Sequence, residues 1–214
     1  MRVFFDYSIF TLQRFGGVSN YIVNLVNNFS EDIDPVIISP IYRNDCLKKT
    51  NKAKKFIYLK KTGTFNKIIN KINKAYFNYK INLEMPKIIH YTYFNEKNFY
   101  NSKIKQIVTE YDLIKEKFYS EKFKSQISYK KELYEKIDHI ICISDNTKKD
   151  LLDNYKIDES KVSVIKLAFN DSKKIRQRSI NIKPFILFVG NRERYKNFNN
   201  TIRAYALSQK IIAG

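Results

Sequence analysis

Two adjacent glycines, Gly16 and Gly17, follow the apolar run at residues 2–5 and precede a helical pattern. Glycine permits positive φ and a close approach of the backbone, and the first turn of a helix offers unbonded N–H groups to an anion. Two glycines alone are more typical of an ordinary tight turn, but their position after the first strand supports a phosphate-binding turn. Ser19 or Gly17 is predicted to cap the helix. Its apolar positions are Val18, Tyr21, Ile22, Leu25, Val26 and Phe29.

A basic pair, Arg192 and Lys196, follows another glycine, Gly190. Arginine can bind an anion through two parallel hydrogen bonds, whereas lysine acts as a point charge. Together they would stabilise negative charge that grows on a leaving group. Such contacts are stronger in the transition state than in the ground state, so they would accelerate the reaction, and they could replace a metal ion. The alternative, in a chain with a formal net charge of +19, is a solvated basic loop.

Three further side chains, His90, Tyr111 and Asp112, stand at or just beyond the carboxyl ends of predicted strands. Ligands of open α/β sheets bind at this edge. Asp112 is predicted either to orient a ligand or to cap a helix, and His90 either to support the strand end or to contact a ligand. The phenol of Tyr111 can hydrogen-bond a hydroxyl group, but it titrates at about 10 and is a poor proton relay.

Nucleophilic and metal-dependent chemistry is not indicated. Ser144 and Thr147 are interpreted as helix-cap residues because no histidine lies near them in the sequence, and Glu116 as a surface carboxylate. The two cysteines, Cys46 and Cys142, cannot build a disulfide framework, and Cys142 lies in an apolar run typical of a buried strand. With only two histidines, far apart in sequence, a zinc site is not expected.

The elements that must position these residues alternate strand and helix. Strands are predicted over 2–5, 35–39, 55–59, 87–91, 105–109, 138–144 and 162–165, and helices over 18–29, 64–80, 120–136 and from 145. A loop is predicted over 7–17. Near-continuous Val and Ile in the strands indicates burial on both faces, so we expect a Rossmann-like α/β domain with a parallel sheet over residues 1–168.

A second unit is predicted to begin at residue 184. Residues 169–183 are polar, basic and poorly periodic, and they are interpreted as a linker. Residues 184–190 predict the clearest strand of the chain, and a loop at 191–196 leads to a helix that contains Phe198, Ile202 and Leu207. Because one strand and one helix cannot bury their own apolar faces, residues 184–214 are expected to be the first strand, loop and helix of a truncated domain.

The composition of the chain limits the classes of protein to which it can belong. Of 214 residues, 43% are hydrophobic, which is ample for a core and excludes global disorder. The excess of lysine is interpreted first as a base bias of the genome. A nucleic-acid-binding face and attraction to anionic lipid are the two alternatives. No apolar stretch reaches the roughly 20 residues of a membrane span, and the cysteine content suits a reducing cytosol.

Five segments, in order along the chain, resemble motifs of glycosyltransferase family 4, the group 1 glycosyltransferases of GT-B fold. They match a Gly-Gly loop, a strand-end segment, an aspartate loop, a serine-capped helix start and the strand–loop that opens a second domain. The segments are residues 9–21, 90–94, 109–118, 143–151 and 188–198. Tyr111 departs from the pattern, because many members have a histidine there.

This resemblance implies two Rossmann-like domains that face a cleft, with the acceptor on the N-terminal one and a nucleotide-sugar on the other. It implies a retaining reaction without metal or cofactor. Carried over residue by residue, it assigns the donor diphosphate to Gly16, Gly17, Arg192 and Lys196. It assigns the catalytic and acceptor side to Asp112, Tyr111 and His90.

The expected activity is transfer of a hexosyl unit to a glycan or lipid-linked acceptor in cell-surface polysaccharide synthesis. We expect a cytoplasmic protein, with the inner membrane face as an optional peripheral contact and no nucleic-acid partner. Members usually carry two glutamates deep in the second domain, and none follows here, so we expect no turnover from this chain alone. The alternatives are a non-catalytic basic binding module and an inactive remnant.

Overall fold

The computed structural model describes residues 1–60, 65–94, 103–168, 185–190, 192 and 194–213. The chain divides into two compact units, Met1–Ala168 and Phe169–Gly214, and each is described by itself. The predicted linker at 169–183 lies outside the described residues. Within them, no helix is both long and apolar enough to cross a membrane.

The first unit alternates strands and helices, as the sequence predicts. Its strands are β1 (Arg2–Phe5), β2 (Asp34–Ile38), β3 (Ile41–Tyr42), β4 (Ala53–Lys54), β5 (Ile57–Tyr58), β6 (Ile88–Tyr91), β7 (Lys105–Glu110), β8 (His139–Cys142) and β9 (Val162–Val164). Its α-helices are α1 (Ser8–Leu12), α2 (Gly17–Asn27), α3 (Asn66–Glu84), α4 (Ile114–Tyr119), α5 (Lys124–Lys136) and α6 (Asp145–Asn154). Two short 3-10 turns are η1 (Cys46–Lys49) and η3 (Glu159–Lys161).

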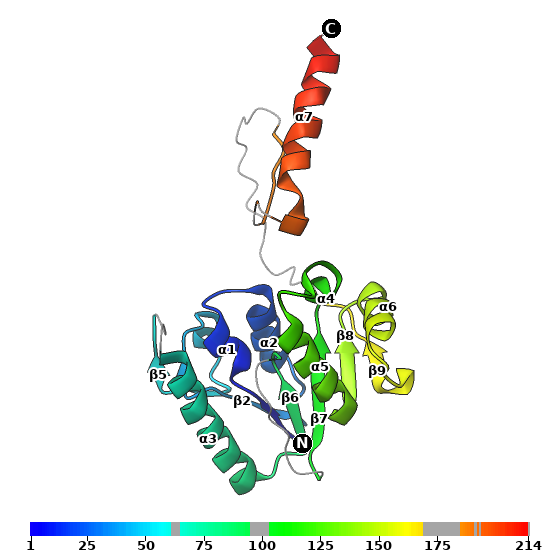
Figure 1. Ribbon diagram of the computed structural model, residues 1–214. Coiled ribbons are helices and arrows are strands. Elements are labelled where there is room, and N and C mark those ends of the chain that lie inside the picture. Colours follow the sequence, from blue (N-terminus) through cyan, green and yellow to red (C-terminus); the bar gives the residue numbers. More distant parts are fainter. Residues whose placement is uncertain (61–64, 95–102, 169–184, 191, 193, 214) are drawn as a thin grey trace. The chain divides into compact units, whose positions relative to one another are not determined.

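Seven strands form one sheet in the order β4-β2-β1-β6-β7-β8-β9. Every neighbouring pair is parallel, and helices lie on both faces (Figure 1). β3 and β5 make a separate parallel pair. The predicted Rossmann-like α/β fold is confirmed. The strand order reverses direction between β1 and β6, and ligands of such sheets bind outside the carboxyl ends of the strands at this point.

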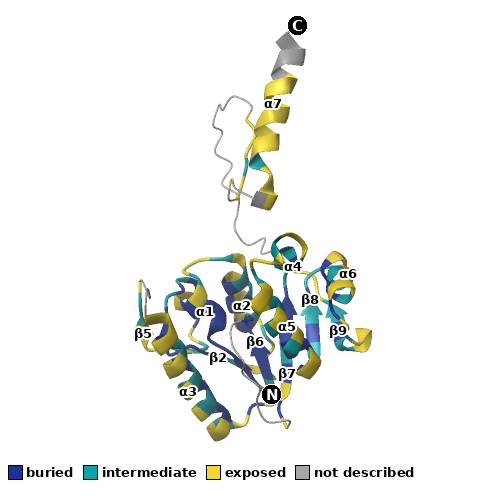
Figure 2. Cartoon of the chain, in the orientation of Figure 1, coloured by how far each residue is buried: buried dark blue, intermediate teal, exposed yellow. Residues whose placement is uncertain are grey.

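Side chains that alternate along the strands fill a core on each face of the sheet. Phe4 points to one face, whereas Val3 and Phe5 point to the other. The first face packs on α3, α5 and α6 through residues that include Phe77, Leu133 and Leu151. The second packs on α2 and η1 through Ile22, Val26 and Leu47. Figure 2 shows the central strands as the most buried part of the first unit.

The structure differs from the sequence predictions in short segments. The predicted loop at 7–17 contains the five-residue helix α1. The strand predicted over 55–59 forms only at the two residues of β5, and the two-residue strand β4 precedes it. The helix predicted over 120–136 begins at Lys124 and is preceded by α4. Elements this short carry too few residues to show a period. The prediction that Cys142 is buried is confirmed, and burial raises the pKa of its thiol to about 12.

In the second unit, the predicted helix forms as α7 (Phe198–Ala213), after the turn η4 (Arg194–Lys196). The predicted strand at 184–190 is wrong over its described part, because residues 185–189 form no strand. Their side chains are largely exposed; Leu187 and Val189 are 73% and 78% exposed. A strand requires a neighbour for its N–H and C=O groups, and none pairs with this segment in the described chain.

Candidate functional site

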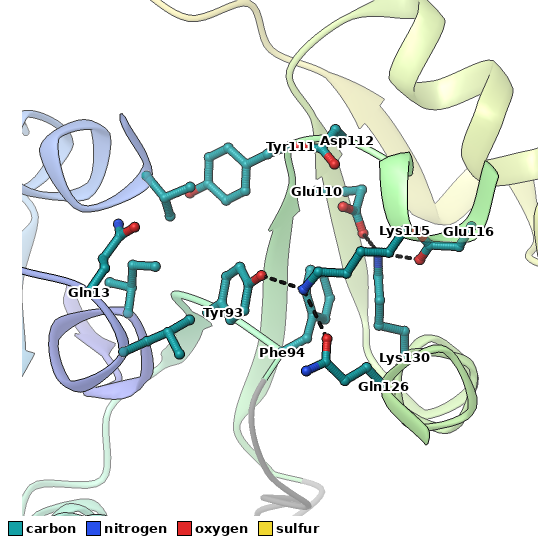
Figure 3. A pocket seen from close by; sticks show the side chains of 13 residues that line it. Gln13, Tyr93, Phe94, Glu110, Tyr111, Asp112, Lys115, Glu116, Gln126 and Lys130 are labelled. Carbon is teal, nitrogen blue, oxygen red and sulfur yellow. Dashed lines mark hydrogen bonds and ion pairs between the residues drawn. The ribbon is translucent and has the colours of Figure 1, made fainter. Parts of the chain in front are cut away.

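A pocket of about 200 Å³ opens at the carboxyl ends of β1, β6 and β7, where the strand order reverses. Gln13 and Gln126 reach it from opposite sides, and Lys115 extends over it (Figure 3). Open α/β sheets bind their ligands at this position, outside the carboxyl ends of the strands. The lining residues are Ile9, Leu12, Gln13, Val18, Tyr93, Phe94, Glu110, Tyr111, Asp112, Lys115, Glu116, Gln126 and Lys130.

The glycine pair lies at the start of α2, between the pocket-lining residues Gln13 and Val18. Gly16 is the N-cap and Gly17 the first helical residue, and no side chain caps this terminus. Ser19, one of the two predicted caps, instead lies inside the helix, where its Oγ donates to the Gly16 carbonyl at 3.1 Å. A Cβ on Gly16 would collide with the Gln13 side chain, whereas one on Gly17 would meet nothing within 4 Å. The backbone at Gly17 is therefore open to a ligand.

Tyr111 and Asp112 directly follow β7 and both line the pocket. The Tyr111 ring stands edge-on to Tyr21 of α2, with 5.9 Å between ring centroids. Burial raises the pKa of the Tyr111 phenol, so it stays protonated at neutral pH. Asp112 is exposed, and its Oδ1 accepts a hydrogen bond from the Ile114 N–H at 3.1 Å, just before α4. The geometry therefore allows Asp112 either to orient a ligand or to cap the start of α4.

A buried ion cluster forms the floor of the pocket. The Lys130 ammonium of α5 lies 2.8 Å from a Glu110 carboxylate oxygen and 2.7 Å from Glu116. Tyr134 donates to Glu110, and Tyr155 donates to Glu116 at 2.8 Å. The Glu116 side chain is only 4% exposed, so its interpretation as a surface carboxylate is wrong.

The electrostatics of this cluster follow from its burial. Burial raises the pKa of Glu110 against the opposing effect of Lys130. Burial lowers the pKa of Lys130, but the two carboxylates outweigh it, and the pKa of the ammonium is raised. The cluster holds β7, α4 and α5 together beneath the pocket.

Lys115 provides the cation that faces the pocket from above this floor. Its ammonium donates to the Tyr93 hydroxyl at 2.8 Å and to Gln126 Oε1 at 2.9 Å. It also lies 5.1 Å from the centre of the Phe123 ring. These contacts fix aromatic, amide and ammonium groups around one opening.

Glu110, Lys115 and Lys130 line the pocket but were not among the site residues predicted from the sequence. A signal existed for Lys130, which stands three residues after Ile127 and four before Tyr134, on the face of α5 that otherwise packs inward. A charged residue at such a position is rarely buried without a partner.

His90 lies beneath the pocket and does not line it. Its ring is 2% exposed, and Nε2 lies 2.9 Å from the Thr109 hydroxyl of the neighbouring strand. Burial lowers its pKa to about 4, so the ring is neutral. This geometry favours the structural alternative for His90.

Ser144 caps α6 as predicted, because its Oγ accepts from the Thr147 N–H at 3.1 Å. The Thr147 hydroxyl in turn donates to the Tyr111 carbonyl at 3.4 Å. The two residues therefore join the start of α6 to the segment that carries Tyr111 and Asp112.

In the second unit, Arg192 and Lys196 both follow Gly190, and Lys196 is the last residue of η4. Gly190 has φ 138°, a conformation that favours glycine, and the Lys196 side chain passes beside it. The Arg192 guanidinium lies 5.2 Å from the centre of the Phe198 ring, and both basic side chains are exposed. Their charges are open to solvent.

A family model described as Glycosyltransferase Family 4 matches residues 15–173. The chain belongs to glycosyltransferase family 4. The family indicated by the five sequence segments is thereby confirmed. No curated protein matches the chain.

Two of the solved structures to which this chain is similar are those of HepE and WaaB. The Anabaena protein HepE, in complex with UDP, aligns with a TM-score of 0.50 and 8% identity, over 79% of this chain and 44% of that one. The lipopolysaccharide outer core galactosyltransferase WaaB, in its apo form, aligns with a TM-score of 0.44 and 14% identity, over 78% and 45%. The chain thus spans less than half the length of either. The likeness to HepE concerns the fold alone.

Proposed function

We propose that this chain is the acceptor side of a glycosyltransferase that moves a hexosyl unit from a nucleotide-sugar to a glycan or lipid-linked acceptor in cell-surface polysaccharide synthesis. The observation that carries the proposal is the pocket at the point where the strand order reverses, with Asp112 and Tyr111 at its edge. Family membership supports it. HepE, which has this fold, is described with UDP, and this supports a nucleotide-linked donor.

Asp112 is the group that we assign to the acceptor hydroxyl. Its Oδ1 is held by the Ile114 N–H, which fixes the carboxylate, and Oδ2 makes no hydrogen bond to any described residue. A fixed carboxylate oxygen can accept from a sugar hydroxyl and orient its oxygen for attack. The neutral phenol of Tyr111 and the face of Tyr93 complete a surface suited to an uncharged sugar ring.

We assign the donor diphosphate to the turn at Gly16 and Gly17, whose backbone is open at Gly17, and to Arg192 and Lys196 of the second unit. The reaction proposed is a front-face displacement with retention. The acceptor oxygen bonds to the anomeric carbon as the bond from that carbon to the diphosphate oxygen breaks, and the hydroxyl proton passes to the departing diphosphate. Arg192 and Lys196 stabilise the charge that grows on this group. The reaction would take place in the cytoplasm, at the inner face of the membrane for a lipid-linked acceptor.

The acceptor half of the proposal is tested by saturation-transfer NMR with a panel of neutral hexosides. Asp112→Ala should weaken hexoside binding by about 10- to 100-fold, since hydrogen bonds to charged groups contribute about 1.5–3 kcal/mol. Asp153→Ala, at another exposed aspartate, is the matched control and should bind like the wild type. Equal binding by all three proteins would remove Asp112 from the site.

The donor half is tested by nucleoside-diphosphate release in a protein that joins this chain to the C-terminal half of a family member. Arg192→Ala should lower turnover by about 100-fold or more, the effect of losing one donor to a developing anion. Arg203→Ala, at an exposed position on α7, is the control. Unchanged turnover in Arg192→Ala would contradict the role assigned to it.

A further inference from the structure

Helix α3 carries a second apolar stripe that the core does not use. The buried stripe is Ile69, Asn73, Phe77 and Ile81, four residues apart. The other stripe is exposed: Ile68, Ile72, Tyr79 and Leu83 are 55%, 47%, 59% and 61% exposed. At about 100° per residue, these four side chains fall within about 60° of the helix circumference. They form one continuous line along the helix.

The stripe extends onto the segment beside β5. Phe56 is 65% exposed, and its ring packs edge-on against Tyr76 of α3, with 5.5 Å between ring centroids. Phe65, which directly precedes α3, is 65% exposed, and Ile57 of β5 is 52% exposed. In Figure 1, β5 lies near the N-terminal end of α3. We call this surface the α3 face: Phe56, Ile57, Phe65, Ile68, Ile72, Tyr79 and Leu83.

The charges beside the α3 face are positive. Lys67 and Lys71 are exposed and lie one helical position from Ile68 and Ile72, on the flank of the helix between the exposed stripe and the core stripe. The one acidic residue of α3 is Glu84, in its last turn, and it is bound by both Arg2 and Lys80. The apolar line is therefore bordered by cations without an exposed acid on the same helix.

The direction of α3 places one end of this face level with the pocket. The Glu84–Arg2 ion pair sets the C-terminal end of α3 beside the start of β1, at the amino edge of the sheet. A helix of 19 residues is about 28 Å long, so its N-terminal end reaches the carboxyl edge, where the pocket opens.

We propose that the α3 face docks the chain on a membrane surface that contains anionic lipids. Aromatic and branched side chains enter the boundary between headgroups and acyl chains, while lysines at the border contact lipid phosphates. A protein partner or a second copy would also cover apolar residues. The two exposed lysines beside the stripe, on a helix whose one acid is paired, favour an anionic lipid surface over either. The inference extends the proposed lipid-linked acceptor but requires no sugar transfer, because its readout is binding alone.

The test is cosedimentation of the 214-residue chain with vesicles. The chain should bind vesicles of equal parts phosphatidylcholine and phosphatidylglycerol, bind phosphatidylcholine alone far more weakly, and lose affinity as salt increases. Lys67→Glu/Lys71→Glu should weaken binding to anionic vesicles by at least about 30-fold. The control is Lys149→Glu/Lys156→Glu, two exposed lysines that change the net charge equally, and it should weaken binding by less than about threefold.

The apolar contribution has its own pair of variants. Ile68→Ser/Ile72→Ser should weaken vesicle binding by at least about tenfold, whereas Phe118→Ser, at a 61% exposed residue of α4, should not. Equal losses in the charge variant and its control would overturn the proposal, because total charge would then explain binding. Vesicle-independent dimerisation that Ile68→Ser/Ile72→Ser abolishes would also overturn it, in favour of a second copy.

Discussion

Two segments of this chain share one sequence pattern and differ in structure. Residues 2–27 and residues 185–213 both run from an apolar stretch through a glycine turn into a helix. The first forms a strand, β1, whereas in the second the described residues 185–189 form no strand before α7. Phe4 and Phe5 are fully buried, whereas Ile186 and Leu187 are 69% and 73% exposed.

The two segments differ because a strand forms only where neighbouring strands pair with its backbone. β1 is paired on one side with β2 and on the other with β6, so its backbone groups are satisfied and its side chains covered on both faces. Residues 185–189 are all apolar but have no paired strand among the described residues. An apolar segment therefore tends to form a strand, but it does so only when the neighbouring strands of a sheet pair with it.

The largest expected effect comes from truncating one side chain in each segment. Phe4→Ala should lower the free energy of unfolding by about 3–5 kcal/mol, because it leaves a cavity in the core beside Phe77. Leu187→Ala should change it by less than about 0.5 kcal/mol. Urea denaturation followed by circular dichroism measures both. A loss above about 1 kcal/mol in Leu187→Ala would show that the second segment is packed in solution.

A comparable contrast is expected between a buried and an exposed lysine. Lys130→Met should cost about 3–5 kcal/mol, because Glu110 and Glu116 would remain buried without a counter-charge. Lys196→Met, at an exposed position, should leave unfolding unchanged within about 0.5 kcal/mol. Equal effects would mean that the cluster beneath the pocket is solvated.

The pH dependence of Lys130→Met sharpens this prediction. Burial already raises the pKa of Glu110 above the value of 4.5 for an ordinary glutamate, and loss of the cation raises it further. The folded variant then binds a proton more tightly than the unfolded chain, so its stability falls as the pH rises through the raised pKa. The deficit relative to wild type should be smallest at pH 4 and largest at about pH 8. A deficit independent of pH would assign it to packing instead.

The sheet was predictable from sequence where strands are long and continuous. Residues 35–38, 88–91 and 139–142 are buried strands as predicted, because Val and Ile on both faces leave only a two-sided sheet as a solution. The small elements were not predictable. α1 has no side-chain cap, and β4 and β5 have two residues each, so neither capping nor periodicity marks them.

The site was predictable at its edge and not at its floor. Strand ends place Asp112 and Tyr111 at the carboxyl edge from local pattern alone. The Glu110–Lys130 pair joins residues on different elements, so the inward position of Lys130 on α5 indicates its burial but not its partner. His90 shows the reverse case, in which a residue type suited to chemistry is used to join β6 to β7.

The smallest expected effect separates the two interpretations of the first glycine turn. Gly17→Ala should raise the free energy of unfolding by about 0.5 kcal/mol, because a Cβ there meets nothing and alanine restricts the unfolded chain. If the same open space receives the donor diphosphate, the added methyl group should weaken nucleotide-sugar binding, measured by calorimetry in the protein joined to its donor half. Stability and affinity would then move in opposite directions. A rise in stability with unchanged affinity would identify Gly16 and Gly17 as an ordinary tight turn. The two glycine turns would then differ only in that Gly190, at φ 138°, requires glycine, whereas Gly17 does not.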